Sequence, residues 1–446
     1  MKRLISTVSI ISILIYAIVI ASDKNNFFVP ISYIPLLFGL LNALFIKSEM
    51  LFGPGTKVAY FVMLIRYLIS PLLLLNSHYF TIYELTSTKM FLSVALMMIE
   101  MIVIVITISS YKKRPSGILQ IEDKKYSFII PGLLLFVSLV WSAMNPVPLS
   151  RYHFILEGAT EMYYVDLEDS ARGLPRLLSF THMFLLTMLV ILVYQRYQRK
   201  HNKPRFWIGL IIVLLLACFY EDVSRNSMLI PLLSLMFLFG KLFERFRSKV
   251  VSVFLVIIFI SMGFLTLLKQ FKTTSFEANL FNENNSSLIL ERYFGGTVGV
   301  YECMQHVSEV KAKINNTTLL TEAFGNMFFV GRLFNVGYNN RTSAFYNEAV
   351  QSESYIIPTI SEGFFHFGWV FCWLLSFIIF RLILYFDKLF MSSRRIDYSF
   401  VFAYISVSLG WMHPGNFIIC MTSLHSGLAL LIFYLINGII GEKVRF

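Results

Sequence analysis

The sequence predicts an all-α polytopic membrane protein with about twelve transmembrane helices, and three observations predict it. Of the 446 residues, 57% are apolar and only 14% are charged, whereas soluble globular proteins average about 25% charged residues. The apolar residues gather in runs close to the roughly 20 residues with which a helix crosses a bilayer. The loops between these runs alternate between basic and non-basic.

This composition excludes a soluble enzyme, a disordered chain and a disulfide-stabilised domain. The positive charges that give the net charge of +12 lie mostly in alternate loops. They therefore reflect membrane topology and give no reason to expect a nucleic-acid partner. The four cysteines form no CxxC pair and no cluster with histidine. The sequence therefore predicts neither a disulfide framework nor a metal site.

The first apolar run is longer than the roughly 7–15 apolar residues of a signal peptide, so we expect an uncleaved helix. The runs 206–220 and 228–240 are short, and one helical hairpin is an alternative reading of them. The run 356–386 is too long for one perpendicular helix, so its first turns are expected to lie along the outer surface or re-enter. The twelve predicted spans cover residues 4–22, 31–47, 58–76, 89–110, 127–144, 177–194, 206–220, 228–240, 250–268, 356–386, 397–412 and 418–437.

Every second loop is strongly basic, as the positive-inside rule requires of the cytoplasmic side. Twelve spans place both termini in the cytoplasm. The basic set consists of Lys2 and Arg3; Lys47 and Lys57; Lys112, Lys113, Arg114, Lys124 and Lys125; Arg196, Arg199, Lys200, Lys203 and Arg205; Lys241, Arg245, Arg247 and Lys249; Lys388, Arg394 and Arg395; Lys443 and Arg445. The alternate loops, which are neutral or acidic overall, are 23–30, 77–88, 145–176, 221–227, 269–355 and 413–417.

Two of the outer loops are large, and they divide the chain. Residues 1–268 form a membrane domain of nine helices with the outer loop 145–176. Residues 269–355 form a large extracytoplasmic loop between helices 9 and 10, and residues 356–446 form a second membrane part with helices 10–12. Within the large loop, Thr297–Lys313 has the apolar spacing of an amphipathic helix, and Gly325, Gly331 and Gly337 indicate turns. No internal repeat suggests an inverted-repeat transporter.

Polar residues collect at the outer ends of the spans, and Arg66 and Glu100 are exceptions inside them. The segment 221–227 is a tight turn in which Arg225 stands at the start of the helix 228–240. A helix N-terminus and a guanidinium together suit a phosphate group. The alternative is local: Asp222 pairs with Arg225, and Ser224 caps the helix.

A second polar cluster spans the end of the large loop and the helix after it. Arg332 and Arg341 flank a segment rich in amide and aromatic side chains, including Asn335, Tyr338, Asn339 and Asn340, and Glu353 and Tyr355 follow. Glu362 and His366 are four residues apart, so they share one helix face, and either can accept a proton near neutral pH. Such side chains suit sugar recognition. The alternative is an interfacial helix with an aromatic belt. Outer-loop arginines, namely Arg151, Arg172, Arg176 and Arg292, are more generic, and His413 is a further candidate for lining a cavity.

Ser224-Arg225-Asn226-Ser227 at the start of an apolar helix, and the stretch from Pro358 through Glu362-Gly363 to Phe367-Gly368-Trp369, resemble motifs of the Wzy-type polymerases of bacterial O-antigen and capsule repeat units. The architecture of the whole chain resembles that family too. The resemblance implies an all-helical, GT-C-like membrane glycosyltransferase related to the O-antigen ligases. It would transfer a growing glycan from undecaprenyl diphosphate to a sugar hydroxyl of a new lipid-linked repeat unit. No metal or other cofactor would be needed.

The resemblance also implies a bacterial cytoplasmic membrane location with the active site facing outward, and a chain-length regulator and a flippase as partners. It implies that Arg225 and Arg341 or Arg332 bind the departing diphosphate, and that Glu362, His366 or Glu353 orients the acceptor. The remaining expected substrate-binding residues are Arg172, Arg176, Arg292, Tyr338, Asn339 and Tyr355.

Four other functions remain open from the sequence. An O-antigen-type ligase uses the same donor. A lipid-linked oligosaccharide flippase would have short loops and charges inside the spans. A C-type transferase that uses a lipid monophosphate sugar would show paired acids in its first outer loop, where this chain has Asp23 beside Lys24. A receptor or scaffold would use the outer charges only as anchors.

Overall fold

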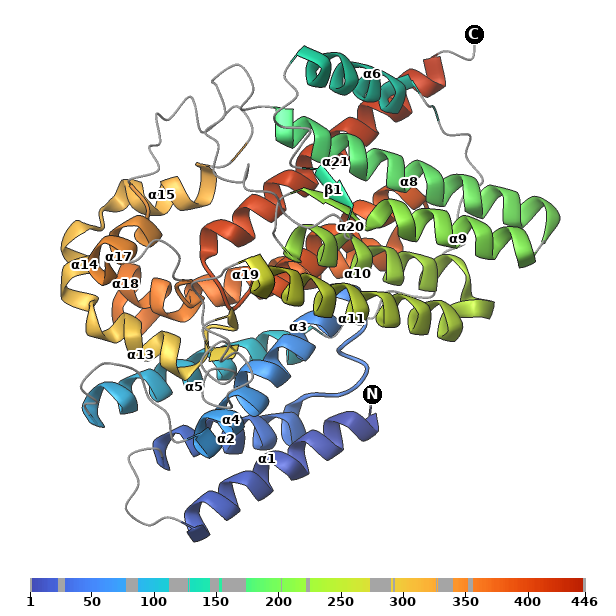
Figure 1. Ribbon diagram of the computed structural model, residues 1–446. Helices are drawn as coiled ribbons and strands as arrows, with labels where there is room; N and C mark the ends of the chain where they lie inside the picture. Colours follow the sequence, from blue (N-terminus) through green and yellow to red (C-terminus); the bar gives the residue numbers. More distant parts are fainter. Residues whose placement is uncertain are drawn as a thin grey trace. The chain divides into compact units, whose positions relative to one another are not determined.

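The computed structural model describes residues 2–22, 29–77, 87–111, 127, 129–144, 152–154, 174–201, 203–221, 225–272, 290–291, 293–325, 327, 340–351 and 356–443 (Figure 1). A helix occupies each of the twelve ranges that the sequence predicts as spans. These helices are α1 (Lys2–Ser22), α2 (Val29–Phe45), α3 (Pro54–Leu64) continued by η1 (Ile65–Ile69) and α4 (Ser70–Ser77), α5 (Ser87–Ser109), α6 (Ile129–Met144), α8 (Leu174–Lys200), α9 (Lys203–Ala217), α10 (Arg225–Leu242), α11 (Arg247–Lys272), α18 (Thr359–Phe371), α19 (Leu374–Ser392), α20 (Ile396–Met412) and α21 (Phe417–Lys443).

Several of these helices are long and apolar enough to cross a membrane, as in a multi-pass membrane protein. Among the described residues, four qualify alone, and the number rises to six if two bent helix pairs each count as one span. The four are Pro54–Leu75, Thr88–Ser109, Leu177–Lys200 and Phe417–Ile439. Four shorter apolar helices of 10–17 residues accompany them. Twelve spans remain a prediction.

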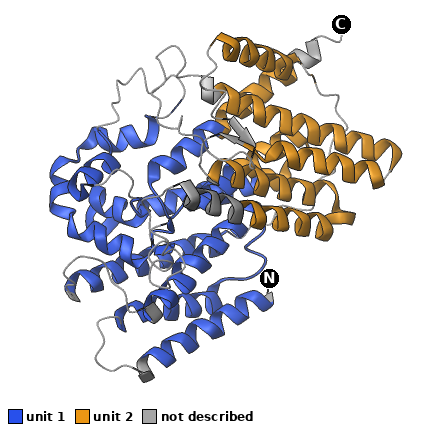
Figure 2. Cartoon of the chain, in the orientation of Figure 1, with its two compact units in different colours: residues 1–115, 278–388, 405–426 blue, residues 116–277, 389–404, 427–446 orange. Residues whose placement is uncertain are grey.

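The chain divides into two compact units (Figure 2). Unit 1 contains residues 1–115, 278–388 and 405–426, and unit 2 contains residues 116–277, 389–404 and 427–446. The predicted division into membrane parts and an outer loop concerns position relative to a bilayer. The two units do not test that division, and it stays a prediction.

In unit 1, close helix contact depends on small residues and on one buried carboxylate. A Cβ atom on Gly55 of α3 would lie 2.5 Å from the Ser406 carbonyl oxygen of α20, so only glycine permits this approach. The Asp387 carboxylate of α19 accepts hydrogen bonds of 2.8 Å from the backbone N–H groups of Gly55 and Thr56. These are among the N–H groups that the first turn of α3 leaves without an intrahelical acceptor. Asp387 therefore stabilises the start of α3 from a distant part of the chain.

The predicted span 356–386 is two helices, α18 and α19, bent by 108°. Gly368, near the end of α18, has φ +66° and ψ −163°, a conformation that favours glycine. This break explains why the apolar run is longer than one perpendicular span requires. The first turns of the predicted span, which form α18, therefore do not continue in line with α19.

The predicted amphipathic helix Thr297–Lys313 is also two helices, α13 (Thr297–Gln305) and α14 (Val307–Lys313). The chain breaks at His306, where φ is −104° and ψ is 16°. Every residue of α13 from Thr297 to Met304 is buried, whereas α14 buries only Val310. The expectation of one amphipathic helix was therefore wrong, because its first half has no exposed face. Two more helices of the predicted large loop follow, α15 (Asn316–Phe324) and α17 (Thr342–Val350).

Unit 2 contains a short strand pair that the sequence did not predict. β1 (Tyr152–Phe154) pairs antiparallel with β2 (Phe219–Glu221), and His153 faces Tyr220. The helix predicted at 206–220 is therefore displaced, since α9 begins at Lys203 and ends at Ala217, three residues before the predicted start and end. Aromatic residues in both segments favour the extended conformation. Unit 2 also contains the one-turn helix η3 (Glu244–Phe246) after α10.

Candidate functional site

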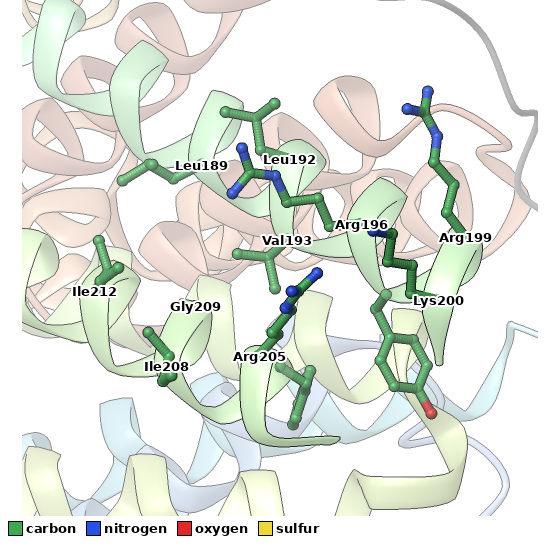
Figure 3. Close-up of a pocket in the computed structure, with 12 residues that line it drawn as sticks. Leu189, Leu192, Val193, Arg196, Arg199, Lys200, Arg205, Ile208, Gly209 and Ile212 are labelled. Atoms are coloured by element: carbon green, nitrogen blue, oxygen red, sulfur yellow. The ribbon is translucent and has the colours of Figure 1, made fainter. Parts of the chain in front are cut away.

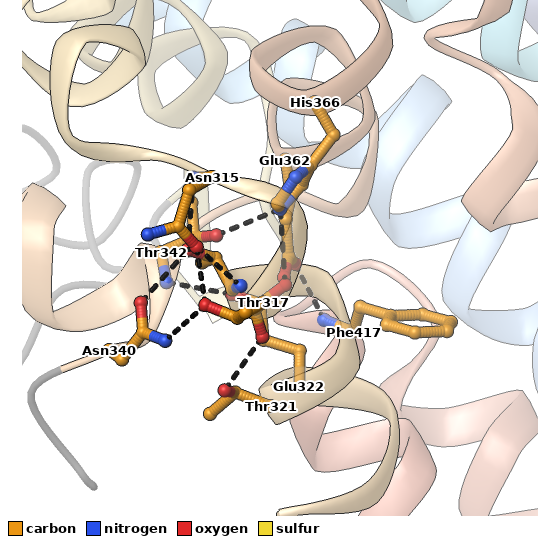
Figure 4. Close-up of polar contacts among 10 residues, drawn as sticks. Asn315, Thr317, Thr321, Glu322, Asn340, Thr342, Glu362, His366 and Phe417 are labelled. Carbon is orange, nitrogen blue, oxygen red and sulfur yellow. Dashed lines mark hydrogen bonds and ion pairs between the residues drawn. The ribbon is translucent and has the colours of Figure 1, made fainter. Parts of the chain in front are cut away.

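A buried polar network in unit 1 joins α15, α17, α18 and α21 (Figure 4). Its centre consists of Glu322 from α15 and of Glu362 and His366 from α18. Glu362 and His366 are four residues apart, and their helix presents both to Glu322, as the predicted shared helix face requires. The side chains of Glu322 and His366 are 1% and 4% exposed, and Glu362 is 1% exposed.

Each acidic group of this network meets protein donors. Glu322 Oε1 accepts the backbone N–H of Thr342 at 2.7 Å, and its Oε2 lies 3.2 Å from His366 Nε2. The same His366 nitrogen lies 3.0 Å from Thr342 Oγ1. Glu362 Oε2 accepts the backbone N–H of Phe417, the first residue of α21, at 2.7 Å. The network therefore fixes the starts of both α17 and α21.

The two carboxyl groups also lie close together, with one oxygen of each within 4.8 Å of the other. Two carboxylates at this distance repel each other, which favours a proton shared between them. Since Glu322 already accepts from Thr342 and meets His366, geometry assigns the proton to Glu362. Burial acts to raise the pKa of Glu322, but the hydrogen bonds from His366, Glu362 and Thr342 and the charge of His366 outweigh burial and lower that pKa below its usual value.

The same three side chains offer a possible ligand set for a cation. One atom each from Glu322, Glu362 and His366 lies within 4.8 Å of the others, and imidazole and carboxylate ligands suit zinc. Hydrogen bonds to Thr342 and Phe417 already account for how the carboxylates are oriented. We therefore treat the cluster as a hydrogen-bonded network whose donor set is also compatible with a divalent metal ion.

Further polar contacts tie the segment before α17 to α15. Asn315 caps α15 by accepting the Thr318 N–H at 3.0 Å. Asn340 accepts from Thr318 Oγ1 at 3.0 Å and donates through Nδ2 to Thr317 Oγ1 at 2.9 Å. Arg341 thus lies between Asn340, which is bound to α15, and Thr342, which is bound to Glu322. Its backbone is extended, with φ −130° and ψ 145°, in the N-cap position of α17.

A second polar centre lies inside the helices of unit 1, around Arg66. The Arg66 side chain projects from η1, a π-helical turn, and such turns occur frequently at functional sites. Its Nη2 lies 2.7 Å from Glu100 Oε2 of α5, and both side chains are fully buried. Glu100 also accepts from Tyr67 Oη at 3.0 Å and from Ser376 Oγ at 2.8 Å. Among the described residues, Nε and Nη1 of Arg66 have no hydrogen-bond acceptor.

Two more titratable groups surround this centre. Glu291 accepts from Ser70 Oγ and, at 2.8 Å, from the Val298 N–H. Burial raises the pKa of Glu291, although both hydrogen bonds and the charge of Arg66 act against the rise. His413 is buried, its Nδ1 lies 2.9 Å from the Gly410 carbonyl oxygen, and its ring packs edge-on against Phe380. The contacts described for the His413 ring are therefore with the protein itself.

The structure describes the side chains of three predicted site residues: Arg341, Glu362 and His366. Two more lie in helices whose backbone alone is described there, namely Arg225, the first residue of α10, and Arg176 in α8. The predicted helix start at Arg225 agrees with the structure. The remaining predicted site residues lie outside the described residues: Arg172, Arg292, Arg332, Tyr338, Asn339, Glu353 and Tyr355.

The residues that sequence reasoning missed are Glu322 and Thr342. Glu322 stands in Leu319-Leu320-Thr321-Glu322-Ala323-Phe324, where a lone acid in an apolar stretch is a weak sign of a buried carboxylate. Nothing in the sequence connects it to His366, 44 residues away. No protein-family model, curated protein or solved structure matches this chain.

Proposed function

We propose that this chain is a membrane glycosyltransferase that polymerises lipid-linked oligosaccharides. It transfers a growing glycan from undecaprenyl diphosphate to the non-reducing end of a new lipid-linked repeat unit at the outer face of the membrane. The observation that carries the proposal is the anchoring of Arg341. Contacts of Asn340 with α15 and of Thr342 with Glu322 and His366 hold this arginine at the start of α17.

Such an arginine suits the chemistry of the transfer. The acceptor hydroxyl attacks the anomeric carbon, the bond from that carbon to the diphosphate oxygen breaks, and the lipid diphosphate leaves with the bonding electron pair. Negative charge therefore grows on the diphosphate, and a preorganised guanidinium stabilises it without having to reorient. The N-terminus of α17 adds a favourable dipole for an anion. The proton of the acceptor hydroxyl passes to a base or to water.

Glu362 and His366 act in this proposal as positioning residues. Both side chains are buried and hydrogen-bonded to protein groups, so they act through the segment that carries Arg341. Their expected role in orienting the acceptor stays a prediction from sequence. Arg225, the second expected diphosphate-binding residue, begins α10, and its own variant tests it.

The test is a polymerisation assay on the purified full chain with one substrate, an undecaprenyl diphosphate-linked repeat unit. A ladder of products from this single substrate supports a polymerase over a ligase. Arg341→Ala is expected to lower the rate by about 10²–10³-fold, the usual cost of one missing charge-stabilising donor. Arg341→Lys keeps the charge but not the bidentate geometry, so its rate should lie between those of the wild type and of Arg341→Ala.

The matched control for the Arg341 variants is Arg245→Ala, which removes an arginine that is exposed in unit 2. Its ladder should equal that of the wild type. A normal ladder from Arg341→Ala at normal expression would exclude Arg341 from the mechanism. The same assay with Arg225→Ala decides the role of that residue separately.

One observation favours a second candidate, a flippase for lipid-linked oligosaccharides. Arg66 and Glu100 are ionisable residues buried inside helices long enough to span a membrane, and such residues commonly mark transport pathways. In vesicles that contain the purified chain, a fluorescent lipid-linked oligosaccharide reports the two functions differently. Movement between leaflets without a new glycosidic bond supports the flippase, and chain growth without movement supports the polymerase.

A further inference from the structure

A groove of about 590 Å³ lies in unit 2 between α8 and α9, which run side by side (Figures 1 and 3). Its inner part is lined by aliphatic side chains, including Leu189 and Val193 from α8 and Ile208 and Ile212 from α9. Ile208 is 58% and Ile212 is 48% exposed. The apolar wall is thus open to the surroundings of the protein.

The other end of the groove is strongly basic. Arg196, Arg199 and Lys200 from the last turns of α8 and Arg205 from the first turn of α9 line it. Figure 3 shows them along one half of the groove, with Leu189, Ile208 and Ile212 in the other half. None of the lining residues is acidic. The sequence contains no Asp or Glu between residues 170 and 220, so no acid from either helix neutralises this end.

The shape of the groove is set by the turn and by one glycine. His201, between the two helices, has φ +44°, a left-handed conformation that reverses the chain tightly and brings the two basic helix ends together. A Cβ atom on Gly209 would lie 2.6 Å from Val193 Cγ2, so glycine allows α9 to approach α8 at the floor of the groove. The rings of Tyr197 and Phe206, with centroids 5.7 Å apart, connect the two helices near the basic end.

We propose that this groove binds one anionic phospholipid. The phosphate would contact the guanidinium groups, since arginine binds phosphate oxygens in a bidentate way, and an acyl chain would lie along the aliphatic wall. A free phosphate would leave that wall exposed, and the headgroup of a neutral lipid would bring no net negative charge to the basic end of the groove. Basic pockets between helices at the cytoplasmic end of membrane proteins commonly bind anionic headgroups. This proposal does not depend on the proposed transferase activity.

The test uses the purified full chain, delipidated in a neutral detergent, and native mass spectrometry with titrated lipid. Phosphatidylglycerol should bind with one tight site, and phosphatidylcholine with the same acyl chains should not. The double variant Arg196→Gln, Arg205→Gln should bind phosphatidylglycerol about 30-fold more weakly, since each cation near a membrane surface contributes about fivefold. The matched control Arg245→Gln, Arg394→Gln removes two exposed arginines of unit 2 outside the groove and should bind like the wild type.

Two further arms distinguish the sources of the phosphate. Ile212→Ser should weaken phosphatidylglycerol binding, because it makes the acyl wall polar, and inorganic phosphate should neither bind tightly nor raise the melting temperature. Equal binding of both lipids, or wild-type binding by the double variant, overturns the proposal. Stabilisation by inorganic phosphate that matches that by phosphatidylglycerol overturns it in favour of a simple anion site. If the double variant fails to fold, Ile212→Ser and the comparison of the two lipids on the wild type still decide.

Discussion

Arg66 and Glu100 form a fully buried ion pair, with Nη2 and Oε2 2.7 Å apart. The two residues come from different helices, each long enough to span a membrane. Glu100 is further held by Tyr67 and Ser376. Taking a charge out of water costs several kcal/mol unless a partner and hydrogen bonds compensate it. Each of the two charges is therefore stable in the protein interior only while the other is present.

The first prediction follows from this dependence. Glu100→Leu should destabilise the protein by about 3–5 kcal/mol, because it leaves the Arg66 charge buried without its partner. The double variant Arg66→Met, Glu100→Leu should recover most of that loss, since two apolar groups need no compensation. Thermal unfolding of the three proteins in one detergent measures the effect. A double variant that is less stable than the single one would contradict the pairing.

The second prediction concerns the shared proton of Glu322 and Glu362. Glu362→Gln should cost less than about 1 kcal/mol, because the amide can donate to Glu322 and its oxygen can still accept the Phe417 N–H. Glu322→Gln should cost about 3 kcal/mol or more, because its amide cannot accept from both Thr342 and His366. Denaturant unfolding of both variants measures the difference, and equal costs would show that geometry assigns the proton to the wrong carboxyl group.

The third prediction is a pH dependence that arises from Glu322. Its pKa is lower in the folded protein than its usual value, so ionised Glu322 stabilises the fold fully above the usual glutamate pKa of about 4.3. As pH falls through the lower folded pKa, this stabilisation is lost. The difference in melting temperature between the wild type and Glu322→Gln should therefore stay constant above about pH 5.3, one unit above that value, and shrink below it. His366 and Glu362 are the titratable side chains that face Glu322, so His366→Gln serves as a comparison. A difference in melting temperature that does not shrink in acid would show that Glu322 is not ionised in the folded protein.

The fourth prediction concerns the kink at Gly368, inside α18. Gly368→Ala should destabilise the protein by about 1–3 kcal/mol, because φ +66° strains any residue with a Cβ atom. No atom lies within 4 Å of the added Cβ, so a clash cannot explain a loss. Gly132→Ala is the matched control: it also has open space, but it lies in the regular helix α6, where alanine should be neutral or stabilising. Equal effects of the two substitutions would contradict the explanation that the positive φ at Gly368 strains an alanine.

The helical ranges could be predicted because they depend on local composition. Twelve apolar runs yielded a helix at each predicted position, and Arg225 begins a helix as its place before an apolar run indicated. The break at Gly368 and the strand pair of Tyr152–Phe154 with Phe219–Glu221 depend on backbone conformation and on distant pairing, and apolar runs do not report either. Glu322 is a related case, because only packing brings it to His366.

The sequence by itself determined that this chain folds as apolar helices suited to a membrane, since the length and spacing of apolar runs are properties of neighbouring residues. It also singled out Arg66, Glu100, Glu362 and His366 as polar residues in unusual places. The tertiary structure alone decided which of them meet. Arg66 pairs with Glu100, and His366 lies with Glu322 at the head of α17, because a buried polar group is stable only where packing supplies a partner, and that partner can come from any part of the chain.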